Sequence, residues 1–139
     1  MPEFIMPMGD PKAEQLFHDL PAFTRGYIEA MFFTNSGSGD DGDMEHATFA
    51  DLAPEALEAI KAECAAFETK HALLLDGAYG HDDYDAESAG RDFWYTRNGH
   101  GVGFWDRGLG HVGDLLSDAA RHSERSPYMG DDGLVYISA

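Results

Sequence analysis

The segment from Ala89 to Arg107 and the helix after it hold the densest set of side chains that can do chemistry. A histidine beside a carboxylate can act as a general base, and His and Asp side chains bind divalent metals. One hypothesis is therefore a small metal-dependent hydrolase that uses residues 92–111, with these catalytic residues: Asp92, His100, Asp106 and His111. The chain contains no HExxH, CxxC or glycine-rich phosphate loop. The preferred interpretation of this segment is structural, with no catalytic residue, metal or cofactor assigned.

Acidic side chains offer a second kind of chemistry, which is binding. The 139 residues include 26 acidic and 9 basic side chains, and the formal net charge is -17. Residues 1–90 carry 19 of the acidic residues and only 4 of the basic ones. Nucleic acids and anionic membranes are bound by clustered Lys and Arg. The charge therefore argues against direct binding to nucleic acid or membrane, and it favours a basic protein partner.

The candidate partner-binding surface combines one helix with two loops. Spaced carboxylates can occupy a basic groove built for phosphates, and long-range attraction makes such association fast. Twelve residues make up this expected surface: Asp40, Asp41, Asp43, Glu45, Glu55, Glu58, Glu63, Glu68, Asp82, Asp83, Asp85 and Glu87. The prediction requires that these side chains converge into one patch when the chain folds.

Apolar spacing predicts the elements that position these residues. Leu57, Ile60, Cys64, Phe67, His71 and Leu74 recur at spacings of three and four, which predicts one long helix over Pro54–Leu75. Three further helices are expected over Pro11–Leu20, Ala22–Thr34 and Gly110–His122. The single cysteine lies on the apolar line of the long helix and is expected to be buried and structural.

Aromatic and turn residues predict strands in the last third of the chain. Residues 92–97 and 102–106 are expected to pair as an antiparallel hairpin through the turn at 98–101. A second strand pair is expected at 128–130 and 134–137. The predicted class is α+β, with several helices packed on a small three- or four-stranded antiparallel sheet.

The length of the chain fits a single domain over residues 1–139, with residues 1–10 loosely ordered. One cysteine cannot form an internal disulfide. No apolar run reaches the roughly 18 residues of a membrane span, and the start lacks the pattern of a secretory signal. The expected location is the cytoplasm.

The segment Gly90–Arg107, of the form GxDFWxTRNGHGxGFWDR, resembles a family of small acidic proteins of bacteriophages and other mobile elements. The similarity extends to residues 26–30, 64–67, 108–122 and 128–133. It implies a context, an accessory protein active in the host cell, but no activity and no functional residues.

Charge and resemblance together predict a protein that binds and inhibits a host defence or nucleic-acid-binding protein, such as a CRISPR or restriction complex, through an acidic surface that mimics DNA. The expected partner is a basic host protein. Two alternatives remain open: the hydrolase that uses residues 92–111, and a structural or regulatory phage protein that self-associates through exposed aromatic side chains.

Overall fold

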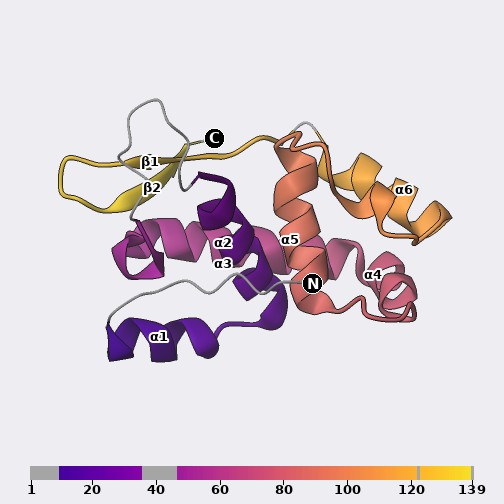
Figure 1. Cartoon of the computed structure of the whole chain (residues 1–139), viewed down its shortest axis with the longest axis horizontal. Coiled ribbons are helices and arrows are strands. Elements are labelled where there is room, and N and C mark those ends of the chain that lie inside the picture. The colour runs from indigo at the N-terminus through magenta and orange to yellow at the C-terminus, as the bar shows by residue number, and fades with distance from the viewer. Residues whose placement is uncertain (1–9, 36–46, 122, 139) are drawn as a thin grey trace.

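The computed structural model describes residues 10–35, 47–121 and 123–138. These residues form six α-helices, two 3-10 turns and two strands: α1 (Pro11–His18), α2 (Ala22–Asn35), η1 (Phe49–Asp51), α3 (Pro54–Lys70), α4 (Ala72–Tyr79), α5 (Ala86–Arg97), η2 (Phe104–Asp106), α6 (His111–Ala120), β1 (Ser126–Met129) and β2 (Val135–Ser138). Figure 1 shows the strands at one end of the long axis and helices α4 and α6 at the other. The α+β class is consistent with this arrangement. The sheet has two strands in the described chain, where three or four were expected.

Helices α2 and α5 cross at the centre of the molecule, and a glycine on each lets their backbones meet. A Cβ atom on Gly26 would lie 2.0 Å from the carbonyl oxygen of Glu87, and one on Gly90 would lie 1.9 Å from that of Phe23. Both distances are far inside van der Waals contact, so any larger residue would force the helices apart. The crossing therefore depends on glycine at these two positions.

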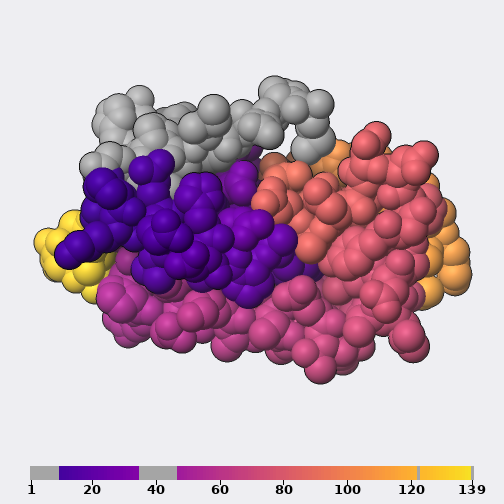
Figure 2. All heavy atoms as spheres, turned by 90° about the horizontal axis from the view of Figure 1, so that it is seen from below, coloured from indigo at the N-terminus to yellow at the C-terminus, as the bar shows by residue number. Residues whose placement is uncertain are grey.

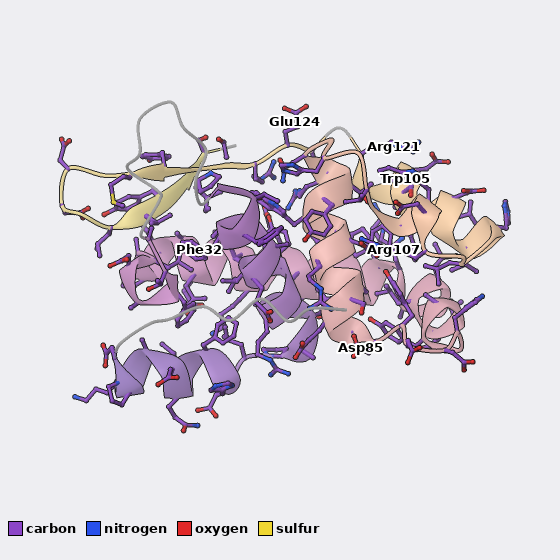
Figure 3. The ribbon with its side chains drawn as sticks, viewed as in Figure 1. Phe32, Asp85, Trp105, Arg107, Arg121 and Glu124 are labelled. Atoms are coloured by element: carbon purple, nitrogen blue, oxygen red, sulfur yellow. The ribbon has the colours of Figure 1, made fainter. Side chains whose placement is uncertain are left out.

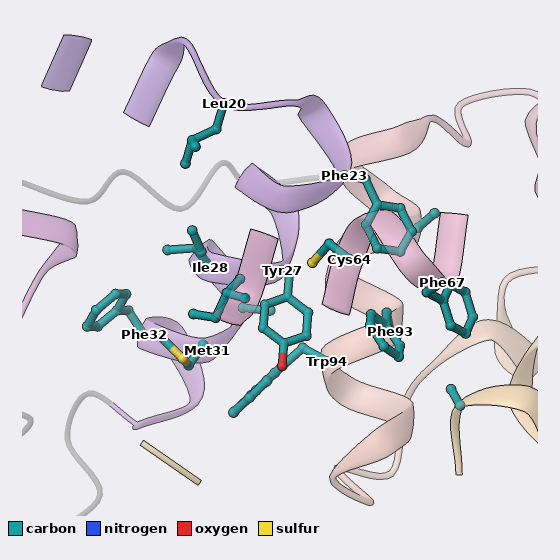
Figure 4. Packing of buried hydrophobic residues seen from close by; sticks show 14 of the residues in the cluster. Leu20, Phe23, Tyr27, Ile28, Met31, Phe32, Cys64, Phe67, Phe93 and Trp94 are labelled. Atoms are coloured by element: carbon teal, nitrogen blue, oxygen red, sulfur yellow. The ribbon is translucent and has the colours of Figure 1, made fainter. Parts of the chain in front are cut away.

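Aromatic side chains fill the space around the crossing. Tyr27 of α2 meets Trp94 of α5 edge to face, with ring centroids 5.3 Å apart, and Phe93 stacks on Phe67 of α3 at 4.2 Å. Figure 4 shows these rings and Cys64 gathered between the three helices. Cys64 is fully buried, as the apolar line predicted, and burial raises the pKa of its thiol to about 12. The thiol is therefore protonated and structural.

The expected hairpin over residues 92–106 is wrong, because residues 92–97 lie in helix α5. Adjacent residues Phe93 and Trp94 are both buried. A strand would send them to opposite faces, whereas a helix covered on two sides can bury both. The second expected strand, 102–106, contains the 3-10 turn η2 instead. The turn between them is real, since Gly99 and Gly101 both adopt positive φ.

The long helix predicted over residues 54–75 is two helices. Its backbone breaks at His71, where φ is -116° and ψ is 29°, and α4 continues from Ala72. Helices α1, α2 and α6 begin and end within two residues of their expected bounds. Of the expected loose start, residues 1–9 lie outside the described chain, and Asp10 caps α1 by accepting a hydrogen bond from the Lys12 amide. None of the described helices is both long and apolar enough to cross a membrane.

The strand pair expected near the end of the chain is confirmed. Strands β1 and β2 are antiparallel, with Tyr128 opposite Tyr136 and Met129 opposite Val135. The amide of Ala53 donates a 2.9 Å hydrogen bond to the carbonyl oxygen of Val135. This bond fixes the β1–β2 pair, called the hairpin from here on, beside the first turn of α3.

Candidate functional site

Asp92 is a buried structural group rather than an exposed acid, since its side chain is only 1% exposed. The Tyr84 hydroxyl donates a 2.7 Å hydrogen bond to it, and Nε of Arg107 donates another at 3.0 Å. Burial raises the pKa of Asp92, and the hydrogen bonds from Arg107 and Tyr84 counteract that rise. These contacts tie α5 to the segments on either side of it.

Of the other three residues of the hydrolase hypothesis, Asp106 shares a partner with Asp92, because Nε of Arg107 also lies 3.8 Å from its carboxylate. Asp106 accepts a 3.0 Å hydrogen bond from the Gly103 amide inside the turn η2. The His100 ring lies beside Trp94, and burial lowers the pKa of His100. His111 is exposed at the start of α6.

No group of three or more His, Cys, Asp or Glu side chains in residues 10–35, 47–121 and 123–138 is arranged to hold a metal ion. All four residues of the hydrolase hypothesis lie in those ranges. They therefore do not form the metal site that this hypothesis requires.

Arg97 is the centre of an ionic network at the α2–α5 crossing, and its side chain is only 4% exposed. It donates hydrogen bonds to Glu63 at 2.8 Å and to the Tyr27 hydroxyl at 3.0 Å, and its guanidinium carbon lies 4.6 Å from the Phe93 ring centroid. Arg125 donates a 2.8 Å bond to the other carboxylate oxygen of Glu63. Glu63, which was predicted as a partner-binding residue, therefore neutralises two guanidinium groups, and its side chain is 29% exposed.

The remaining acidic residues of the predicted surface differ in their exposure and in whether they form ion pairs. Asp40, Asp41, Asp43 and Glu45 lie outside the described residues. Glu87 pairs with Arg25 at 3.0 Å and with Arg91 at 3.8 Å, and Glu58 pairs with Lys61 at 3.4 Å. Asp85 caps α5 by accepting a hydrogen bond from the Ser88 amide. Glu55, Asp82 and Asp83 are exposed, and Glu68 is half-buried.

Two groups of the described acidic residues, Glu55 and the residues at 82–87, lie at opposite ends of α3, and Glu58, Glu63 and Glu68 lie along the helix between them. Glu55 lies in the first turn of α3, beside the hairpin. The residues at 82–87 lie between α4 and α5, at the far end of α3. Helix α3 has 17 residues, so its axis separates the two groups by about 25 Å. Figure 2 shows α3 along one edge of the molecule, between the yellow hairpin and the pink α4.

A groove lies between the hairpin and the first two turns of α3, and we call it the hairpin groove. Its volume is about 600 Å³. It is lined by carboxylates, rings and apolar groups from three elements and the turn: Glu55, Ala56, Ala59, Tyr128, Met129, Gly130, Asp131, Tyr136 and Ile137. Within the described chain, no Lys or Arg lines it. The groove therefore combines concave shape, exposed aromatic surface and negative charge.

The two tyrosines of the hairpin groove have fixed positions. Their rings stack with centroids 5.8 Å apart, and the Tyr136 hydroxyl donates a hydrogen bond to Asp132 in the turn. That bond raises the pKa of Tyr136 to about 12, so its hydroxyl stays neutral. Tyr128 remains 49% exposed.

Sequence reasoning included Glu55 but missed Tyr128, Asp131 and Tyr136. One signal was available. A turn at 131–133 places residue 128 opposite residue 136, which predicts a cross-strand tyrosine pair.

Most basic side chains form ion pairs within the described chain. At least seven of the nine form ion pairs: Arg25, Lys61, Arg91, Arg97, Arg107, Arg121 and Arg125. Nine cations cannot neutralise 26 carboxylates. The surplus negative charge is therefore available to solvent and to partners.

Comparisons of this chain with protein-family models, with curated proteins and with solved structures find no match.

Proposed function

We propose that this chain is a binding protein whose acidic surface engages a basic region of another protein and inhibits it. The proposed target is a host defence or nucleic-acid-binding protein, and the proposed setting is the cytoplasm of a cell that carries a phage or another mobile element. The observation that carries the proposal is the pairing of the basic side chains: at least seven of the nine form ion pairs within the described chain, and the net charge is -17. A basic partner can then approach without meeting a compensating positive surface.

The hairpin groove is the part of this surface with the features of an interface. Interfaces are enriched in aromatic side chains, and Tyr128 is a large ring that is half exposed. Glu55 and Asp131 line the same groove. The second acidic group, at 82–87, contributes long-range attraction.

The first experiment captures partners on the immobilised full chain from an extract of a bacterial host, at about 50 mM and at about 500 mM salt. The expected result is capture of a basic nucleic-acid-binding protein at low salt only, and its release by added duplex DNA or RNA. The purified partner should then lose nucleic-acid binding when the chain is added. Capture that resists both salt and nucleic acid would contradict the proposal.

A charge-reversal pair tests where the partner binds. The triple variant Glu55→Lys, Glu58→Lys, Asp131→Lys should abolish capture, because it reverses the field at the hairpin end of α3. Glu63 is left unchanged because it neutralises Arg97 and Arg125.

The matched control for this triple variant reverses three exposed carboxylates elsewhere: Glu14→Lys, Asp76→Lys and Asp114→Lys. It carries the same net charge and should reduce capture only slightly. Equal capture by both variants would show that the hairpin end is not the interface.

A further inference from the structure

Two of the six arginines of the chain, Arg97 and Arg121, are each held by an aromatic ring together with a carboxylate. Arg97 bonds to Glu63 at 2.8 Å and lies over the Phe93 ring at 4.6 Å. Arg121 bonds to Asp118 at 3.2 Å, and its guanidinium carbon lies 5.6 Å from the Trp105 ring centroid. Figure 3 shows Trp105 and Arg121 side by side near α6. A planar guanidinium suits both partners, since it can stack on a ring while its edge donates to a carboxylate.

The hairpin groove contains the same two components without a cation. Glu55 and Asp131 supply carboxylates, and Tyr128 and Tyr136 supply rings. Tyr136 is fixed by its bond to Asp132, and Tyr128 is stacked on Tyr136, so both rings are ordered before any ligand arrives. In the described part of the chain, no Lys or Arg lines the groove to complete the combination.

We propose that the hairpin groove binds an arginine side chain presented by an extended segment of a protein partner. The guanidinium stacks on Tyr128 and donates to Glu55 and Asp131. The volume of about 600 Å³ exceeds that of one side chain, so neighbouring residues of the segment also fit. This inference rests on the proposed function, because it names the group on the basic partner that the acidic surface recognises.

Arginine is expected to bind better than lysine. An ammonium is a compact, strongly hydrated charge, whereas a guanidinium is weakly hydrated, planar and able to donate two parallel hydrogen bonds. A purely electrostatic surface would make no such distinction, so the ratio of the two affinities reports whether the rings take part.

The experiment titrates the isotope-labelled full chain with a capped Gly-Arg-Gly-Arg-Gly peptide at low salt and follows backbone amide shifts. Matched peptides carry lysine or uncharged citrulline in place of arginine. The largest shifts are expected at Glu55, Tyr128, Asp131 and Tyr136. The arginine peptide should bind at least about threefold more tightly than the lysine peptide, and citrulline should not bind measurably.

Variants of the groove separate the ring from the charge. Tyr128→Leu keeps an apolar side chain but removes the ring, and it should abolish the preference for arginine over lysine. Glu55→Gln with Asp131→Asn should weaken arginine binding by at least about fivefold. Glu14→Gln with Asp114→Asn removes the same charge from α1 and α6 and should leave binding within about twofold. Circular dichroism and urea denaturation confirm that each variant is folded.

Equal binding of the arginine and lysine peptides, with shifts spread over both acidic groups and no effect of the groove variants, would overturn this inference. That result would leave the proposed function standing, because capture of a basic partner needs only the acidic surface. Failure of the capture experiment, by contrast, would remove the proposed function whether or not the arginine peptide binds.

Discussion

The α2–α5 crossing and the hairpin groove contain the same side-chain types but differ in whether a basic side chain pairs with them. Each combines aromatic rings with carboxylates. At the crossing, Arg97 completes the combination, and its side chain is 4% exposed. In the groove no basic side chain of the described chain completes it, and Tyr128 remains 49% exposed. The carboxylate and rings of the crossing therefore already hold a cation, whereas those of the hairpin groove are accessible to a partner.

The contrast shows that a count of charges does not locate a binding surface. Glu55 and Glu63 lie on the same helix, two turns apart. Glu63 faces two arginines that come from α5 and from the segment before β1, and it stabilises the fold. Glu55 faces a groove. The neighbours of a carboxylate, rather than its presence on an acidic helix, decide whether its charge is available.

The largest expected loss of stability comes from a substitution that forces helices α2 and α5 apart. Gly90→Ala puts a Cβ atom 1.9 Å from the backbone oxygen of Phe23, and backbone cannot rotate away as a side chain can. The helices must separate and the rings between them lose contact. We expect a loss of about 3 kcal/mol or more in the free energy of unfolding, measured by urea denaturation.

A second glycine provides the control for this variant. A Cβ atom on Gly77, in α4, would meet only the Val112 side chain at 3.4 Å. Gly77→Ala should therefore be neutral or stabilise by up to about 1 kcal/mol through helix propensity. If Gly90→Ala were as stable as Gly77→Ala, the two helices would not be in the close contact described.

The matched pair Glu63→Gln and Glu58→Gln tests the contrast along α3. Glu63→Gln leaves the buried Arg97 without its counter-ion, and we expect a loss of about 3 kcal/mol in the free energy of unfolding. Glu58 is 72% exposed and pairs with Lys61 at the surface, so Glu58→Gln should change stability by less than about 0.5 kcal/mol. Similar urea midpoints for the two variants would mean that the Glu63–Arg97 ion pair stabilises the fold no more than the surface pair of Glu58 with Lys61.

Much of the helical framework could be predicted from the sequence, because single stripes of apolar residues define it. Phe23, Tyr27 and Met31 mark α2, and Ile60, Cys64 and Phe67 mark α3. The failure at residues 92–97 has a physical reason. Phe93 and Trp94 are buried against different neighbours, so α5 has no single apolar stripe, and its aromatic run equally satisfies a strand.

The site was harder to predict than the fold because its parts come from distant segments. Glu55 precedes Tyr128 by more than 70 residues, and contacts such as the bond from Ala53 to Val135 and the Leu52–Val135 bridge bring the two segments together. The ion pair of Glu63 with Arg97 spans 34 residues. Local patterns carry no information on such pairings. The number of carboxylates could therefore be read from the sequence, but not which of them form ion pairs within the fold.

The smallest expected effect is a pH dependence of stability that arises in the core and not in the hairpin groove. Burial lowers the pKa of His71, which packs on Phe67, and of His100, which lies beside Trp94. Lys70 lowers the pKa of His71 further. A depressed folded-state pKa means that the neutral imidazole is favoured in the fold. Its contribution to stability is complete above the unfolded value and is lost as the pH falls through the lower folded-state value.

Stability should therefore decrease slightly between about pH 7.5 and about pH 5.5. Urea midpoints of the wild type at the two pH values should differ more than those of His71→Gln or His100→Gln. No histidine of the described chain lines the hairpin groove. Peptide binding to the groove should then change little over a range in which stability falls. A parallel loss of binding and stability would mean that the groove is not independent of the core.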